Sequence, residues 1–261
     1  MRHILPPLFA TCCAIPAAAQ EAPSAGGLHG QVAVGAGVAP EYDGSDDMRV
    51  IPLLFGDLQL GDVTLELRGL RARADLIADP RLSLGPVIAP RLERNDVDGP
   101  VGLLPEIDTA VEAGAFVGYR LGGDARGQGA VQVELTALHD VSDVHNGSLV
   151  TGSASYAAIR RLDLFVSLDA QATWADADYT RIYFGIAPAA AMASNLAPYD
   201  PGAGFRDVGA GITVGYYFSR RWGVIGRAGA NYLIGDPADS PVTDEGRRWQ
   251  PLAGVALSYR F

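Results

Sequence analysis

Lysine is absent from this 261-residue chain, so all 20 of its basic residues are arginines. Acidic residues number 30, and the formal net charge is −10 at pH 7. Nucleic acid is bound through a basic face, so this balance argues against nucleic acid as a partner. Cysteine is nearly absent as well, because Cys12 and Cys13 are its only two occurrences. The chain beyond them can form no disulfide framework.

Long apolar runs are also missing after the first twenty residues. A spanning helix needs roughly 20 consecutive apolar residues, and no later segment provides them. The backbone groups of an open sheet edge find no partner in hydrocarbon, so a membrane protein without spanning helices has to be a closed β-barrel. Two classes of protein therefore remain as candidates, a soluble β protein and a membrane β-barrel.

The first nineteen residues have the pattern of a cleaved secretory signal peptide. Arg2 and His3 are basic, Ile4 to Pro16 is apolar, and Ala17 to Ala19 supplies an A-x-A cleavage site. We expect residues 1–19 to be a signal peptide, residues 20–27 a flexible lead-in and residues 28–261 a single domain.

The last thirteen residues alternate strictly between apolar and small or polar side chains. Phe261, Tyr259, Leu257 and Val255 fall on one side, which predicts a strand with one apolar face. The aromatic residues stand at the very end and the aliphatic ones further in. This order suits a strand that crosses a bilayer, with its rings at headgroup level. These four residues resemble the signal that the barrel assembly machinery reads in outer-membrane proteins; an edge strand of a soluble sandwich is the alternative.

The same alternation recurs along the chain and favours the barrel. One face is apolar in the segments 111–119, 131–137, 162–174, 208–218 and 224–232, and the other carries glycine, hydroxyl, amide and isolated charged residues. Such a polar face is typical of a barrel lumen. Connections counted back from the C-terminus alternate between long and short, as in barrels with long extracellular loops and short periplasmic turns. The predicted fold class is all-β, with a single antiparallel transmembrane β-barrel.

The strand count depends on residues 49–77. Two strands, 49–60 and 63–77, would give eleven in all and would break the alternation of loop lengths at Gly61-Asp62. The apolar parity also slips at Gly69, and a glycine at such a slip marks a bulge or a turn. We therefore predict one further strand inside 49–77 and twelve strands in all, with ten as the alternative.

Three loops carry a resemblance to a known family. Residues 39–46 (APEYDGSD) fit its Pro-x-Tyr-x-Gly-Ser pattern, and Trp174 to Gly209 and Gly235 to Val242 (GDPADSPV) are similar as well. The chain resembles the MltA-interacting protein (MipA/OmpV) family of outer-membrane proteins, although Met48 stands where an aromatic residue is usual. The resemblance implies the outer membrane of a Gram-negative bacterium as the location. Outer-membrane lipid and the barrel assembly machinery are then partners.

The same resemblance implies a scaffold role. Such a barrel links a murein transglycosylase and a penicillin-binding synthase to the outer membrane. Other relatives are adhesins or porin-like proteins, so a surface adhesin and a diffusion pore are the alternative functions. The sequence leaves open whether the lumen is open.

We expect no catalytic, cofactor or metal site. His139, Asp140, Ser142 and His145 lie close in sequence and could form a small hydrolase or metal site, but short polar side chains of this kind are also typical of turns. The acidic residues of segment 39–47 lack the spacing of a calcium loop. We therefore expect that the protein is not an enzyme and needs no cofactor.

Segment 175–205 is the candidate interaction loop, because apolar and aromatic residues stand there between acidic flanks. Exposed apolar residues on a rigid frame are what a partner surface requires. Within the segment, residues 188–194 (PAAAMAS) could form a short helix over the barrel mouth, with proline in its first turn. The residues expected to contact a partner are Tyr179, Ile182, Tyr183, Phe184 and Met192.

Charged residues on the polar faces are candidate partners across the lumen. They could pair in a narrow interior or form a ring that selects ions. The carboxylates are Glu112, Glu134, Asp163 and Asp169, and the arginines are Arg120, Arg227 and Arg260.

Overall fold

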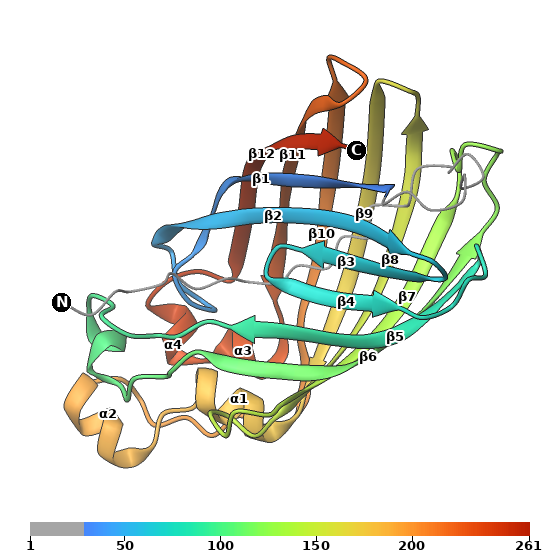
Figure 1. Ribbon diagram of the computed structural model, residues 1–261. Coiled ribbons are helices and arrows are strands. Elements are labelled where there is room, and N and C mark those ends of the chain that lie inside the picture. The colour runs from blue at the N-terminus through green and yellow to red at the C-terminus, as the bar shows by residue number, and fades with distance from the viewer. Residues whose placement is uncertain (1–28) are drawn as a thin grey trace.

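The computed structural model describes residues 29–261, which form one closed antiparallel β-barrel of twelve strands (Figure 1). The predicted signal peptide and lead-in lie outside the described residues. Each strand pairs with its neighbours in the chain, and the last strand pairs with the first. The strands are β1 (His29–Pro40), β2 (Met48–Leu60), β3 (Val63–Arg68), β4 (Arg71–Asp75), β5 (Leu82–Arg91), β6 (Ala110–Leu121), β7 (Val131–Asp140), β8 (Ser148–Arg160), β9 (Leu164–Ala175), β10 (Gly204–Tyr217), β11 (Trp222–Leu233) and β12 (Trp249–Arg260).

The outward faces of the strands are apolar, as the alternation predicted. In β12, Val255 and Leu257 are about half exposed, at 56% and 51%, whereas the residues that follow each of them, Ala256 and Ser258, are buried. An exposed aliphatic belt of this kind is suited to hydrocarbon. Aromatic residues flank it at both ends, as in membrane girdles: Tyr119, Tyr156, Tyr216, Phe218, Trp222 and Phe261 at one end, and Phe205, Tyr232 and Trp249 at the other.

The two ends of the barrel differ in their connections. The short-turn end, which carries Phe261, has the connections 61–62, 76–81, 122–130, 161–163 and 218–221. The loop end has 41–47, 69–70, 92–109, 141–147, 176–203 and 234–248. All helices of the described chain lie at the loop end (Figure 1): η1 (Pro100–Leu103), α1 (Ala177–Phe184), α2 (Pro188–Ser194), α3 (Gly235–Asp239) and α4 (Pro241–Asp244). In residues 29–261 no helix is long and apolar enough to cross a membrane.

The additional strand lies where the parity slips. β3 ends at Arg68 and β4 begins at Arg71, so the segment 63–77 contains two strands. Gly69 forms the turn between them with φ of 64°, a conformation that glycine adopts at little cost. The predicted count of twelve is confirmed. The turn 122–130 is longer than the predicted 121–127, because the Asp124 carboxylate accepts backbone N–H groups up to Gln128.

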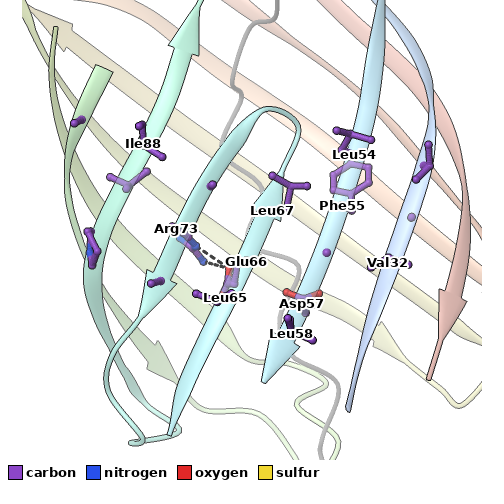
Figure 2. Close-up of a pocket in the computed structure, with 18 of the residues that line it drawn as sticks. Val32, Leu54, Phe55, Asp57, Leu58, Leu65, Glu66, Leu67, Arg73 and Ile88 are labelled. Carbon is purple, nitrogen blue, oxygen red and sulfur yellow. Dashed lines mark hydrogen bonds and ion pairs between the residues drawn. The ribbon is translucent and has the colours of Figure 1, made fainter. Parts of the chain in front are cut away.

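The β3–β4 hairpin is short and stops part-way up the barrel wall. β2 pairs with β3 only from Phe55 to Leu60, and the register of β4 with β5 consists of Ala72↔Ile88 and Arg73↔Val87. On the outer surface, the wall around this hairpin has an apolar hollow of about 860 Å³. Leu65, Leu67 and Ile88 are among the residues that line it (Figure 2).

Many side chains that face the barrel interior are buried. Near the short-turn end a buried apolar cluster lines the six neighbouring strands β9 to β12, β1 and β2, and midway Arg227 donates to both carboxylate oxygens of Asp169, at 2.9 and 3.0 Å. The loop end is closed by α1 and its partners. The apolar cluster consists of Ala33, Leu53, Phe55, Phe165, Tyr217, Ile225 and Ala256.

Candidate functional site

Helix α1 turns into the barrel mouth because its N-cap residue is anchored to the wall. Asp176, the N-cap, accepts the N–H of Tyr179 at 3.0 Å, which satisfies a free donor of the first turn. Its second oxygen accepts the N–H of Ser148, the first residue of β8, at 2.7 Å. Tyr179 and Tyr183 are four residues apart and therefore share one face of the helix. That face is buried, and the two rings stack with centroids 4.5 Å apart.

An apolar cluster surrounds α1 where it meets the wall. Phe184 and Tyr179 are fully buried there. The cluster draws on the loop 92–109 and on three strands besides α1 and α3, so the helix is held on several sides. Its other buried members are Ile107, Leu149, Ala175, Tyr183, Leu233 and Ala238.

A hydrogen-bonded charge network lies beneath the helix. The Tyr179 hydroxyl donates to Asp43 Oδ2 at 2.8 Å and accepts from Arg206 Nη1 at 2.7 Å. Arg206 also binds its neighbour Asp207, with Nε 2.5 Å from Oδ2. Burial raises the pKa of the Tyr179 hydroxyl well above its ordinary value, so the group stays a neutral donor. The tyrosine thereby connects α1 to the 41–47 loop and to β10.

A second pair of charges lies beside the first. Arg91 Nε is 2.5 Å from Glu112 Oε1, and its guanidinium lies 4.9 Å above the Tyr179 ring. His145 Nδ1 accepts the N–H of Gly147 at 3.0 Å, which places the ring proton on Nε2. That nitrogen lies 3.4 Å from Glu112 Oε1. The imidazole also contacts the edges of both tyrosine rings of α1.

Arg94 connects the 92–109 loop to α1. Its guanidinium donates to the carbonyl oxygens of Tyr183 and Pro105, at 3.0 and 3.3 Å. Burial lowers the pKa of Arg94 to about 10, so it remains charged near neutral pH. We call α1 together with Asp43, Arg91, Arg94, Glu112, His145, Arg206 and Asp207 the plug.

The plug is held together by ion pairs between its own residues. Its carboxylates are paired with guanidinium groups, and opposite charges buried together stabilise each other only when the geometry is good. Within residues 29–261 no group of three or more His, Cys, Asp or Glu residues could hold a metal ion. The arrangement fixes α1 across the mouth of the barrel.

Residues 32–261 match the family described as MltA-interacting protein MipA. The chain belongs to this family. The match spans nearly the whole described chain and confirms the resemblance seen in the sequence. With a closed twelve-stranded barrel, this MipA-family protein is an outer-membrane β-barrel.

A comparison with curated proteins gives no match. Among solved structures, an outer-membrane channel from Pseudomonas putida F1 is similar at 12% identity, over 94% of this chain and 99% of that one, with a TM-score of 0.44. OmpT of Vibrio cholerae is similar at 8% identity, over 90% and 97%, with a TM-score of 0.34. OmpF of Salmonella typhi, in complex with daunomycin, is similar at 11% identity, over 90% and 97%, with a TM-score of 0.33.

The candidate interaction loop of the MipA-family barrel divides into two parts. Tyr179, Tyr183 and Phe184 are buried in the plug. Ile182 is 39% exposed on the outer side of α1, and Met192 is 83% exposed on α2. The predicted helix 188–194 is confirmed as α2, which lies beside η1 at the mouth. The four residues of the predicted assembly signal lie on the outward side of β12 or just after it.

The polar residues around His145 make a turn. The Asp140 carboxylate accepts the backbone N–H groups of Ser142, Val144, His145 and Asn146. This confirms the interpretation of the segment as a polar loop. His139 lies apart from His145, with its Nδ1 3.0 Å from Ser148 Oγ.

The predicted partners of the lumen charges are only partly correct. Asp169 binds Arg227 as expected. Glu112 pairs with Arg91, however, and Glu134 with Arg73, and these two arginines were not among the predicted partners. The other predictions fail because their side chains lie near the short-turn end: Asp163 is exposed in a turn, and the Arg260 guanidinium lies over the Tyr217 ring.

Sequence analysis did not single out the arginines of the plug. Arg91 is the last residue of β5 and Arg206 the third residue of β10, so both lie next to loops, where an arginine is usually solvated. One signal was available: Tyr179 and Tyr183 are four residues apart, with Phe184 adjacent and Asp176 placed as an N-cap. That pattern predicts a short helix with one aromatic face, which must be buried.

Proposed function

We propose that this MipA-family barrel is a non-enzymatic interaction protein that holds a murein transglycosylase of the MltA type at the outer membrane. The observation that carries the proposal is the plug. Two buried charge pairs fix a helix across the mouth. This arrangement supports an interaction protein more than a diffusion pore. The family description, MltA-interacting protein, supports the class of partner.

The barrel interior supports the same conclusion. The apolar cluster around Phe55, Phe165 and Tyr217 lines six neighbouring strands near the short-turn end. A hydrated ion that passes there loses contact with water on that side, which is costly. This cost adds to the plug in arguing against a diffusion pore.

The short-turn end is the proposed contact surface for the periplasmic partner. Outer-membrane barrels place their short turns in the periplasm. Arginine is favoured in protein interfaces, and this end exposes Arg81, Arg126, Arg161, Arg220 and Arg221. The proposed contact also includes the lead-in 20–27, because these turns alone are small.

Planar-bilayer conductance of the purified protein tests the closed barrel. We expect no stable ohmic steps. Steady conductance of the unmodified protein would instead favour the diffusion pore.

Binding of a purified MltA-type transglycosylase tests the interaction role. The full mature barrel should bind it, and removal of residues 20–27 or the pair Arg126→Gln and Arg220→Gln should weaken binding. The matched control is Arg181→Gln with Arg248→Gln, which removes the same charge from exposed side chains at the loop end. Equal loss in both double variants, or no binding by the full barrel, would contradict the proposal.

A further inference from the structure

A groove opens on the outer surface of the loop end, on the solvent side of the plug. It lies between the loops 92–109 and 141–147 and the segment 181–200, and its volume is about 990 Å³. Sites for small ligands typically have about 300–1,000 Å³. We call this the outer groove.

The floor of the outer groove is apolar and firmly held. Ile182, Ile186, Val144 and Pro188 line it. Ile186 and Tyr199 form a small antiparallel bridge, with N–H to carbonyl distances of 2.8 and 3.0 Å in the two directions. Arg94 connects Tyr183, the residue after Ile182, to the groove wall at Pro105. A floor fixed in this way keeps its shape without a ligand.

The walls of the outer groove carry an excess of acidic groups. Glu106, Asp108 and Asp143 are exposed, and within residues 29–261 none of them belongs to an ion pair. The fourth carboxylate, Asp200, lies 2.9 Å from Arg181. Arg94 is buried and its donors are used by carbonyl groups. Three carboxylates around an apolar floor are therefore available to cations from solution.

We propose that the outer groove binds a short cationic amphipathic peptide segment. Its basic side chains contact Glu106, Asp108 and Asp143, while its apolar side chains lie on Ile182 and Ile186. Charge complementarity selects against acidic segments, because like charges brought together cost free energy. The site lies at the opposite end of the barrel from the proposed transglycosylase contact and does not depend on it.

The binding test uses the full mature barrel in nanodiscs of zwitterionic phosphatidylcholine, with empty nanodiscs as the blank. The probe is a fluorescent helical peptide of lysine and leucine, compared with its glutamate–leucine counterpart by anisotropy. We expect the lysine peptide to bind the barrel, the glutamate peptide to bind far more weakly, and added salt to reduce the affinity. Equal binding of both peptides, or an affinity that does not change with salt, would show that the peptides bind through apolar contacts alone. Either result would overturn the proposal.

Two triple variants decide whether the groove itself is the site. Glu106→Gln, Asp108→Asn and Asp143→Asn together should weaken the lysine peptide about tenfold, since each exposed charge pair contributes a few-fold. The matched control is Asp46→Asn, Asp244→Asn and Glu245→Gln, which removes three exposed carboxylates of the same end outside the groove. The control should bind as the parent does. If both triples lose the same affinity, the peptide follows overall surface charge and the proposed site is wrong.

The apolar half of the site is tested by Ile182→Ser. This side chain is partly exposed, so the variant should fold, with the heat-modifiable band as the check. Weaker binding of the lysine peptide is expected. Unchanged affinity in a folded Ile182→Ser protein would show that the floor takes no part, and would overturn an amphipathic ligand.

Discussion

Arg73 on β4 and Glu134 on β7 form an ion pair of 2.6 Å, although β5 and β6 separate their strands in the barrel wall. Arg73 also binds Glu66 on β3 and lies over the Phe116 ring on β6. The pair thus connects the β3–β4 hairpin to β7 on the inner side of the wall. The apolar hollow, which Leu65 and Leu67 help to line, lies on the outer face of the hairpin (Figure 2).

Loss of Arg73 should destabilise the barrel markedly. Arg73→Met leaves the carboxylates of Glu66 and Glu134 without this guanidinium, and breaking a buried pair costs about 3–5 kcal/mol. Glu134→Gln should cost less, because the amide can still accept from Arg73. The measurement is urea unfolding in detergent followed by tryptophan fluorescence. Arg81→Met, at an exposed turn, is the control. An equal loss of stability there would mean that the Arg73–Glu134 pair contributes no more than an exposed arginine does.

Arg206 should be the residue on which the plug depends most. Arg206→Met removes the partner of Asp207 and the donor to Tyr179, so α1 should loosen and intermittent conductance steps should appear in planar bilayers. The free energy of unfolding should fall by about 3–5 kcal/mol. Arg248→Met breaks an exposed pair with Asp239 at the same end and should change stability by at most about 1 kcal/mol. A silent bilayer with Arg206→Met would show that the plug stays closed without this charge.

The terminal residue should be required for assembly. Phe261 pairs with Gly30 through backbone hydrogen bonds in both directions, and its ring stacks near Tyr259. Deletion of Phe261, or Phe261→Asp, should abolish folded, heat-modifiable protein in the outer membrane. Phe218→Asp, at another exposed aromatic of the same end, separates loss of girdle burial from loss of the signal. Normal levels of folded Phe261→Asp protein would contradict the role.

Epitope tags at two glycines should report the orientation. Gly99 in the 92–109 loop and Gly127 in the 122–130 turn both have positive φ and open space around them, so an insertion should be tolerated at either. Antibody should stain a Gly99 tag on intact cells and a Gly127 tag only after permeabilisation. The reverse pattern would place the loops in the periplasm.

Sequence periodicity predicts the barrel well because the side chains of each strand alternate between an apolar outward face and a polar lumen face. The parity slip at Gly69 was enough to locate the β3–β4 turn. The partners of Glu112 and Glu134 were not predictable, since they depend on how the strands are staggered around the barrel. The burial of Tyr179 was missed for a similar reason: α1 lies in a loop, and a loop sequence does not say whether it extends outward or turns into the mouth.

The short register between β4 and β5 has a consequence for how the wall moves. β1 and β12 share eight register pairs where the chain closes on itself, whereas β4 and β5 share two. Local opening follows the least supported backbone bonds, so deuterium should enter first at the amides of residues 71–75. Local opening of the barrel is then expected at β4, whereas the junction between β1 and β12 is among the slowly exchanging parts.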